Sequence, residues 1–394
     1  MNKTVQFPTT QADHLPDPQQ SAPKEKIILD ERGMIDMPFL IITVLLVIIG
    51  VVMMFSASYA SAYATEGKST YYFARQGFFA LAGIGIMLFV SRLNYQMWRA
   101  LSFPILAVTA AFMLLTPIIG LTGGGATRWI QVGGIRFQPS EVAKLAIIMS
   151  FAAMISQYKD KMKDIRNLLP FAIILSFMVL TLLFQKHLSG IIIICAVGAA
   201  MLFLGGVQIR WFVLLGVGAV LFLLIYLNTM GYAADRITAW RDPWSDPRGA
   251  GYQIIQSLYA IGSGGLMGLG LGRSRQKYLY LPEEHNDYIF PVVCEELGFV
   301  GALVIILLFM MLIIRGYWIA IHAKDRFGAL MAGGISTLLA LQVFFNIGVV
   351  TNFLPATGIS LPFFSYGGTA LLIQLFEMGL ILSVSRQSDN QLLI

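Results

Sequence analysis

The fold class follows from the stretch MPFLIITVLLVIIGVVMMFSA at residues 37–57, which runs for 21 residues without one charged side chain. A helix needs about 20 apolar residues to cross the roughly 30 Å hydrocarbon layer of a bilayer. The stretch also lacks the alternation of apolar and polar residues that is typical of strands in a membrane barrel. It is therefore predicted to be a membrane-spanning helix.

Similar blocks recur along the chain, whose 394 residues are 57% hydrophobic and only 12% charged. Soluble domains carry about 25% charged residues because they need a wetted surface. We therefore predict an all-α integral membrane protein with about ten transmembrane helices. The predicted spans lie at 37–57, 76–91, 100–120, 141–156, 168–185, 188–206, 211–229, 291–314, 328–350 and 367–385.

The positions of the basic residues predict that both chain ends lie in the cytoplasm. Lys and Arg concentrate in the short cytoplasmic loops of membrane proteins. With the N-terminus inside, the inner pieces hold 15 of the 27 Lys and Arg residues, whereas the short outer pieces hold five. Residues 1–36 are then a cytoplasmic tail, expected to be disordered, 37–387 form the membrane domain, and 388–394 form a short cytoplasmic C-terminus. A large loop at 230–290, between helices 7 and 8, is predicted to be extracytoplasmic.

Composition also disfavours two other kinds of protein. The net charge of +6 does not indicate nucleic-acid binding, because the basic residues stand singly between spans and form no patch. Cys195 and Cys294 lie in or beside apolar segments, so a disulfide framework is not indicated. We expect no nucleic-acid partner; membrane lipids are the expected surroundings.

The 230–290 loop is the segment in which we expect function. Loops longer than about 15 residues are usually functional or disordered, and this one is too aromatic for disorder. Its end places three cations before three carboxylates and a histidine: Arg273, Arg275, Lys277, Glu283, Glu284, His285 and Asp287. The cations could hold a pyrophosphate while a carboxylate acts as general base. A solvated cap at the membrane interface is equally compatible with these residues.

Other polar segments carry weaker signals. In the segment 236–248 the tryptophans are typical of interfacial anchors, although Arg241 could reach a lipid phosphate. Glu141 and Lys144 are three residues apart, which suits an ion pair, but ionisable groups in spans are often functional. The uncharged segment 346–368 fits either a re-entrant segment that grips a sugar or phosphate, or a packed turn. His187 stands alone and does not indicate a metal site.

Taken together, these segments resemble the SEDS family (shape, elongation, division and sporulation), which includes FtsW, RodA and SpoVE. The likeness covers about residues 37–387, in family order. The segment Asn346-Ile-Gly-Val-Val-Thr and the ending Ser385-Arg-Gln look closer to the FtsW/SpoVE branch than to RodA. Where the family commonly has an acidic residue after span five, this chain has His187. The matching motifs are Arg128-Trp-Ile, Gln138-Pro-Ser-Glu141-x-x-Lys144, Gly251-Tyr-Gln-x-x-Gln256-Ser257, Gln276-Lys277, Leu281-Pro-Glu-x-His285-x-Asp287, Glu295-Glu-Leu-Gly298, Leu354-Pro-x-Thr-Gly358 and Leu361-Pro-Phe-x-Ser365-Tyr-Gly-Gly368.

The resemblance implies a peptidoglycan glycosyltransferase that polymerises lipid II into β-1,4 glycan strands outside the bacterial plasma membrane. It implies an inverting reaction with Asp287 as the general base, a class B penicillin-binding protein as partner, and lipid II and lipid-linked glycan as substrates. A divalent cation, Mg²⁺ or Mn²⁺, is also expected by resemblance, with ligands that the sequence does not identify. The residues expected to bind substrate are Lys277, Arg273, Arg241, Arg128, Trp129, Glu141, Lys144, Gln256, Ser257, His285 and Ser365.

Two functions from other classes remain as alternatives. A lipid II flippase would suit ten helices with intramembrane Glu141 and Lys144, but transport predicts sites near the bilayer midplane. The chain shows no convincing internal repeat, and its polar residues gather at the predicted outer edge. A non-catalytic scaffold of the cell-wall synthesis complex is the third hypothesis.

Overall fold

The computed structural model describes residues 33–123, 126–133, 135–158, 162, 164–213, 216, 218 and 231–388. Within these residues, eight helices are long and apolar enough to cross a membrane, and α6 (Leu188–Leu204) is a shorter apolar helix. The all-α membrane fold is therefore confirmed. The long helices are α1 (Met37–Glu66), α2 (Tyr71–Val90), α3 (Gln96–Ile119), α4 (Pro139–Tyr158), α5 (Leu169–Phe184, preceded by the 3-10 turn η2, Ile165–Leu168), α10 (Ile289–Ile321), α11 (Arg326–Val350) and α12 (Gly368–Gln387).

The count of ten spans stays a prediction. Nearly all of the expected seventh span, 211–229, lies outside the described residues, as does most of the tail at 1–36 and the segment 389–394. The observed helices also extend beyond several predicted spans, since α1 continues to Glu66 and α10 to Ile321.

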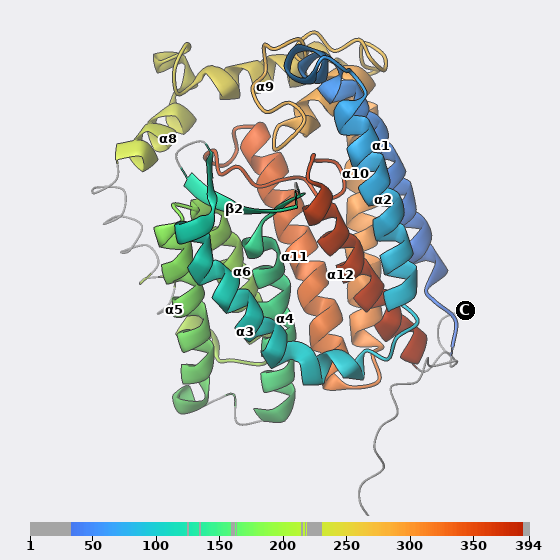
Figure 1. Ribbon diagram of the computed structural model, residues 1–394, viewed down its shortest axis with the longest axis vertical. Coiled ribbons are helices and arrows are strands. Elements are labelled where there is room, and N and C mark those ends of the chain that lie inside the picture. Colours follow the sequence, from blue (N-terminus) through green and yellow to red (C-terminus); the bar gives the residue numbers. More distant parts are fainter. Residues whose placement is uncertain are drawn as a thin grey trace, which may run out of the picture.

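Three helices form the centre of the bundle. Figure 1 shows α4, α11 and α12 between α3, α5 and α6 on one side and α1, α2 and α10 on the other. In the most apolar window of α4, 89% of residues are buried, against 67% in α11 and in α12 and 39% or less in the other long helices. A helix that faces protein on all sides can carry polar residues that lipid would not accept. This explains why α4 tolerates Glu141 and Lys144.

The first helix begins where its sequence predicts. The Asp36 carboxylate accepts a hydrogen bond from the Phe39 backbone N–H at 2.9 Å, which caps the helix, and a proline follows within the first turn. The same carboxylate pairs with Arg315 near the end of α10 at 2.8 Å. The cap therefore also joins two distant helices at one end of the bundle.

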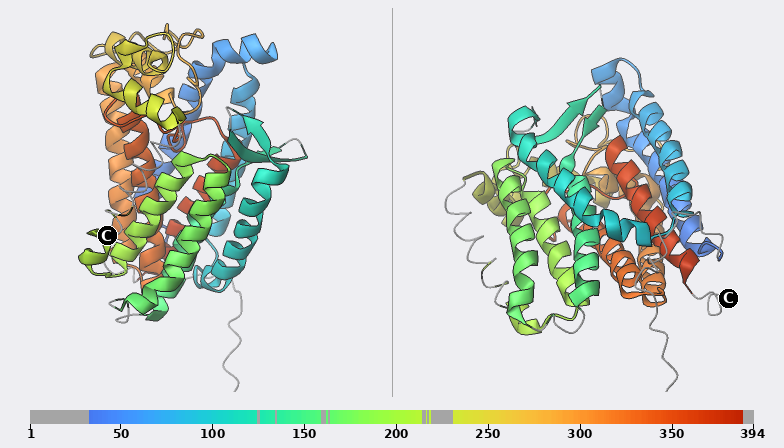
Figure 2. Two further views of the ribbon diagram at one scale, coloured as in Figure 1. Left: turned by 90° about the vertical axis from the view of Figure 1, so that its left-hand side faces the viewer. Right: turned by 60° about the horizontal axis from the view of Figure 1, so that its bottom comes forward.

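A small antiparallel sheet lies at the opposite end of the bundle, between the predicted spans 100–120 and 141–156 (Figure 2). Its strands are β1 (Leu121–Gly123), β2 (Ala126–Val132) and β3 (Ile135–Phe137), in the order β1-β2-β3. Side chains alternate between the two faces of a strand. This alternation is interrupted at Arg128, because Leu121 pairs with Trp129 whereas Thr122 pairs with Thr127.

The helix α10 is broken at Gly298, whose φ of +70° lies in the left-handed region. A bend of this kind frees backbone groups that need other partners. The preceding loop supplies them, because the N–H groups of Phe299 and Val300 donate to the carbonyls of Gly265 and Leu266 at 2.9 and 3.1 Å. The loop thus fits into the bend and gains a fixed position on the bundle.

Two buried glutamates of α10 hold the next part of the loop. Glu295 accepts hydrogen bonds from the Ser274 hydroxyl and the Arg275 backbone N–H at 2.5 and 2.9 Å. Glu296 pairs with the buried Lys277 ammonium at 2.9 Å and accepts a bond from Ser56 of α1 at 2.7 Å. These bonds hold residues 274–277 against α10. They thereby restrict the position of the segment 283–287, which follows in the same loop.

The rest of the large loop folds as α8 (Gly231–Arg241), the 3-10 turn η3 (Pro243–Ser245) and α9 (Tyr252–Ser263). In Figure 1, α8 and α9 lie at the same end of the bundle as β2. Ser257 of α9 donates to the carbonyl of Val350, at the end of α11, at 2.6 Å. The sequence-distant polar segments therefore gather at one end of the molecule.

Candidate active site

The segment 283–288 sets the position of Asp287 immediately before α10. Glu283 has a φ of +57°, which is uncommon for a residue with a side chain. Its carbonyl accepts hydrogen bonds from the N–H groups of Asn286 and Tyr288 at 3.0 and 3.2 Å. The Asn346 amide of α11 donates to the Asp287 carbonyl at 2.7 Å. The backbone that carries Asp287 is thus fixed from both sides.

Asp287 lines a cavity of about 440 Å³ that is formed by segments from most of the chain. A Cβ atom added to Gly358 would lie 3.3 Å from the Asp287 Oδ2 atom, so the carboxylate faces the turn at 357–358. The polar side chains around the cavity are Arg128, Gln138, Ser140, Glu141, Lys144, His187, Ser189, Arg236, Gln253, Glu283, Asn286, Asp287, Gln342, Thr357, Ser360 and Ser365.

The environment of Asp287 suits a general base. Burial of the carboxyl group and the nearby charge of Glu283 raise the pKa of Asp287 to about 7, although Arg236 and Arg128 act in the opposite direction. A base works best when its pKa lies near the operating pH. Asp287 can therefore accept a proton near neutral pH and release it again.

Three cations line the same cavity. Arg236 of α8 donates to the Ala356 carbonyl at 2.7 Å, which ties the 230–290 loop to the turn before α12. Arg128 comes from β2, and Lys144 of α4 pairs with Glu141 at 2.7 Å. Guanidinium groups bind phosphate oxygens in a planar, two-pronged geometry. The cavity thus joins a carboxyl base to groups that can hold a pyrophosphate.

His187 also lines this cavity, in the turn between α5 and α6. Burial, together with the charges of Arg128 and Lys144, lowers the pKa of His187 to about 3, so the imidazole is neutral near pH 7. Its buried Nδ1 atom has no hydrogen-bond partner within the described part of the chain. Such a ring can bind a substrate hydroxyl or amide, in place of the acidic residue that the family commonly has there.

A second cavity of about 990 Å³ adjoins the first. The two share part of their lining, namely Trp129, Glu283, Asn286, Tyr366 and Gly367. The second cavity is lined by the aromatic side chains of Tyr71, Tyr72, Phe78 and Phe79. It is also lined by two arginines that do not line the first cavity, Arg75 and Arg136.

The structure brings together part of the residue set predicted from the sequence. Five of the predicted substrate-binding residues line the cavity that contains Asp287: Arg128, Trp129, Glu141, Lys144 and Ser365. His285 lines the second cavity.

The other five predicted residues lie elsewhere. Lys277 is buried in its pair with Glu296, so its ammonium group serves the fold. The Ser257 hydroxyl is bonded to the Val350 carbonyl. Arg273 and Arg241 are exposed, Gln256 is half-buried, and none of the three lines either cavity. We therefore assign no substrate contact to these five.

Several cavity residues were not predicted to bind substrate. Arg236 follows the expected seventh span. Glu283 and Asn286 belong to the segment 283–287, in which Asp287 and His285 were the residues predicted to act on substrate. Tyr72 and Arg75 lie more than 200 residues before Asp287, and only the fold places them near it. A sequence signal existed for this last pair, since Tyr71-Tyr72-x-x-Arg75 opens an apolar span with polar and aromatic side chains.

A divalent cation fits this cavity only if the substrate supplies some of its ligands. The described residues contain no group of three or more His, Cys, Asp or Glu side chains that could hold a metal ion. Mg²⁺ commonly binds through one or two carboxylates together with substrate phosphates. Glu283 and Asp287 provide two carboxylates on one cavity, and this donor set suits such sharing.

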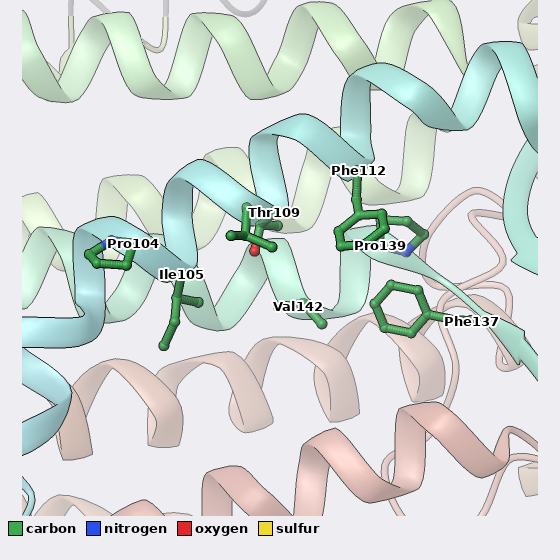
Figure 3. Close-up of a pocket in the computed structure, with 8 residues that line it drawn as sticks. Pro104, Ile105, Thr109, Phe112, Phe137, Pro139 and Val142 are labelled. Atoms are coloured by element: carbon green, nitrogen blue, oxygen red, sulfur yellow. The ribbon is translucent and has the colours of Figure 1, made fainter. Parts of the chain in front are cut away.

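An apolar groove of about 270 Å³ runs along α3 beside the site (Figure 3). Phe112, Phe137 and Pro139 lie at one end of the groove in Figure 3, and Ser140 and Glu141, which follow Pro139 in α4, line the cavity of Asp287. The groove is lined by Pro104, Ile105, Val108, Thr109, Phe112, Phe137, Pro139 and Val142. An apolar chain in the groove would thus end close to the polar site.

Comparisons with known proteins identify the family. Residues 37–390 match the FtsW/RodA/SpoVE family, described as cell cycle proteins. The chain is 41% identical to a probable peptidoglycan glycosyltransferase FtsW of Geobacter sulfurreducens, covering 89% of this chain and 95% of that one. It is 42% identical to the stage V sporulation protein E of Bacillus subtilis, covering 90% and 97%.

Solved structures share the fold. One comes from a study titled "Structural coordination of polymerization and crosslinking by a peptidoglycan synthase complex"; it has a TM-score of 0.75 and 26% identity, covering 91% of this chain and 99% of that chain. The rod shape determining protein RodA of Thermus thermophilus gives a TM-score of 0.68 at 24% identity, covering 91% and 98%, and supports the fold alone.

Proposed function

The chain belongs to the FtsW/RodA/SpoVE family of multi-pass membrane proteins, and we propose that it is a peptidoglycan glycosyltransferase that polymerises lipid II into β-1,4 glycan strands. The observation that carries the proposal is the cavity in which the Asp287 carboxyl, with its pKa raised to about 7, lies among arginines suited to a pyrophosphate. The names of the relatives support the same activity.

The proposed reaction joins two lipid-linked substrates. The donor is a glycan attached through an α bond to undecaprenyl pyrophosphate, and the acceptor is the 4-hydroxyl of a lipid II GlcNAc. As the acceptor oxygen bonds to the donor anomeric carbon, the bond to pyrophosphate breaks and the configuration inverts. The hydroxyl proton passes to Asp287, a step that contributes about a hundredfold or more to such reactions.

The departing pyrophosphate carries charge that the protein must stabilise. Preorganised cations in a site with little water are effective at this because they need not reorganise during the reaction. Arg128 and Arg236 fill this role in the proposal, and Lys144 adds positive charge that its pairing with Glu141 holds in place. If a divalent cation takes part, Glu283 would hold it and it would neutralise phosphate charge.

The apolar groove along α3 suits a polyprenyl tail. Its lining presents only apolar surface, and one end lies at the start of α4 beside the polar cavity. A tail held there keeps the reacting headgroup at the cavity and raises its effective concentration. The carrier lipid is thereby a positioning device as well as an anchor.

The reaction is proposed to take place at the outer face of the bacterial plasma membrane. The distribution of Lys and Arg supports this orientation, with the chain ends inside and the cavity end outside. A class B penicillin-binding protein is the proposed partner, because a transpeptidase crosslinks the strands that this activity supplies. The solved structure from a peptidoglycan synthase complex is consistent with that pairing.

The test is polymerisation by purified protein in lipid. Wild type should convert lipid II to long glycan, whereas Asp287→Asn should still bind lipid II but polymerise at least ~100-fold more slowly. Asp246→Asn is the matched control, since Asp246 is an exposed carboxylate of the same loop that lines neither cavity. Normal polymer from Asp287→Asn would exclude the base, and lipid movement without polymer would favour a flippase.

A further inference from the structure

The second cavity has no part in the reaction proposed above, yet it shares part of its lining with the Asp287 cavity. Its volume of about 990 Å³ exceeds that of the Asp287 cavity. Trp129, Asn286 and Tyr366 line both cavities, so a ligand in one would meet a ligand in the other along this boundary. A polymerase that joins two lipid-linked sugars needs two such adjoining sites.

Three aromatic rings form one wall of this second cavity. The rings of Tyr72 and His285 are stacked, with centroids 4.8 Å apart and planes 22° apart. Tyr366 meets Tyr72 edge-on at 4.8 Å. The faces of aromatic rings carry negative charge density, and the C–H groups on one side of a pyranose are weakly positive. A cluster of aromatic side chains on the cavity surface is therefore suited to a sugar ring.

The wall is held by the backbone as well as by ring contacts. The Tyr366 N–H donates to the His285 carbonyl at 2.8 Å. On α2, the buried Gln76 side chain donates to the Ser365 carbonyl at 3.2 Å and accepts a bond from the Gly367 N–H at 3.3 Å. The turn at 365–367 is thus fixed against α2, so the aromatic wall is formed before any ligand binds.

Two arginines give this cavity positive charge. The Arg75 guanidinium lies 5.0 Å from the centre of the Tyr71 ring, and Arg136 reaches the cavity from β3. Both side chains are exposed, unlike Lys144 in the first cavity. Arginine suits phosphate in either setting, but exposed charges are screened by water and contribute mainly to binding.

This contrast decides which substrate each cavity holds. Charge develops on the donor pyrophosphate as its bond breaks, and this needs cations shielded from water. The acceptor pyrophosphate does not react, so it needs binding alone. The more enclosed cations stand with Asp287, and the exposed ones stand with the aromatic wall.

From this we propose that the second cavity is the acceptor subsite: it binds the disaccharide of a pyrophosphate-linked lipid on the Tyr72–His285–Tyr366 wall, with Arg75 and Arg136 at its pyrophosphate. The inference rests on the proposed function. The acceptor GlcNAc then crosses the boundary at Trp129 and Asn286 and presents its 4-hydroxyl to Asp287. Tyr72 and Arg75 are positioning residues for the acceptor.

The experiment uses two lipid II analogues that can each play one part. A 4-deoxy-GlcNAc analogue lacks the nucleophile and acts only as donor. A C-glycosidic analogue lacks the leaving oxygen and acts only as acceptor. Full-length protein in lipid, given both, makes a single tetrasaccharide bond, so the KM for each partner is measured separately.

In Tyr72→Ala and in Arg75→Gln, the KM for the acceptor-only analogue should rise about tenfold, while the KM for the donor-only analogue stays within about twofold. Tyr72→Phe, which keeps the ring, should restore most of the acceptor affinity. Tyr63→Ala and Arg248→Gln change an exposed tyrosine and an exposed arginine that line neither cavity, and should leave both constants unchanged.

Two results would overturn the acceptor assignment: a rise in the KM for the donor-only analogue alone, or no change in either KM for variants that are folded. Thermal unfolding of each variant shows whether it is folded. The proposed function fails separately, because it requires the coupling rate of Asp287→Asn to fall at least ~100-fold, whatever the result for Tyr72 and Arg75.

Discussion

The two ends of the segment 273–287 carry similar charged side chains but have opposite surroundings. At one end, Lys277 is fully buried and pairs with Glu296 at 2.9 Å, beside Ser56. At the other end, the Asp287 carboxyl faces a cavity and the turn at Gly358. The first end fastens the loop to α1 and α10, and the second presents a reactive group.

The difference teaches that burial alone does not mark a functional charge in this protein. A buried charge with a close partner of opposite sign holds the structure together. A carboxyl whose pKa is raised by burial and by a like charge is held in a state that favours proton transfer. The predictions that follow separate these two kinds of charge.

The largest expected effect on stability comes from loss of the Lys277–Glu296 ion pair. Lys277→Met leaves the Glu296 carboxylate buried without its counter-charge, which typically costs about 3–5 kcal/mol. We expect a large fall in the thermal unfolding midpoint of the detergent-solubilised protein. Arg273→Met, an exposed change in the same segment, should alter the free energy of unfolding by less than about 0.5 kcal/mol.

A compensating variant checks the cause. Lys277→Met combined with Glu296→Gln removes both charges but keeps an oxygen that can accept from Ser56, so it should regain part of the lost stability. If Lys277→Met unfolds at the wild-type temperature but loses polymerase activity, Lys277 belongs to the site after all, and the contrast between the two ends fails.

A smaller effect is expected at the leaving-group side of the cavity. Arg236→Gln should lower kcat about tenfold, because one cation that stabilises the departing pyrophosphate is lost. Arg241→Gln, on the same helix but outside both cavities, is the matched control and should retain full activity. Equal losses in the two variants would mean that overall charge of α8, and no specific contact, matters.

Much of the fold could be predicted because lipid imposes a simple rule on sequence. Apolar runs such as 37–57 and 328–350 correspond to α1 and α11, since a helix in lipid must satisfy its own backbone. The sheet was missed because its strands are only three to seven residues long and lie between two long apolar spans. The break at Gly298 was also missed, because the loop that supplies its hydrogen bonds is distant from any local pattern.

The candidate site could be predicted only where its residues are close together in sequence. Asp287 and His285 were found because charges cluster before an apolar span. Lys277 belongs to the same cluster, and only the position of Glu296 shows that its ammonium group lies in a buried ion pair. Arg75 also precedes an apolar span, but only the packing of α2 against α12 brings it to the cavity.

The most direct test of Asp287 as the base is the pH dependence of the initial coupling rate. The ionised carboxylate accepts the proton, so a pKa of about 7 predicts a low rate at pH 5, a rise centred near pH 7 and a plateau above pH 8. The residual activity of Asp287→Asn should lack this rise. A wild-type rate that is flat or falls between pH 5 and 8 would contradict the account.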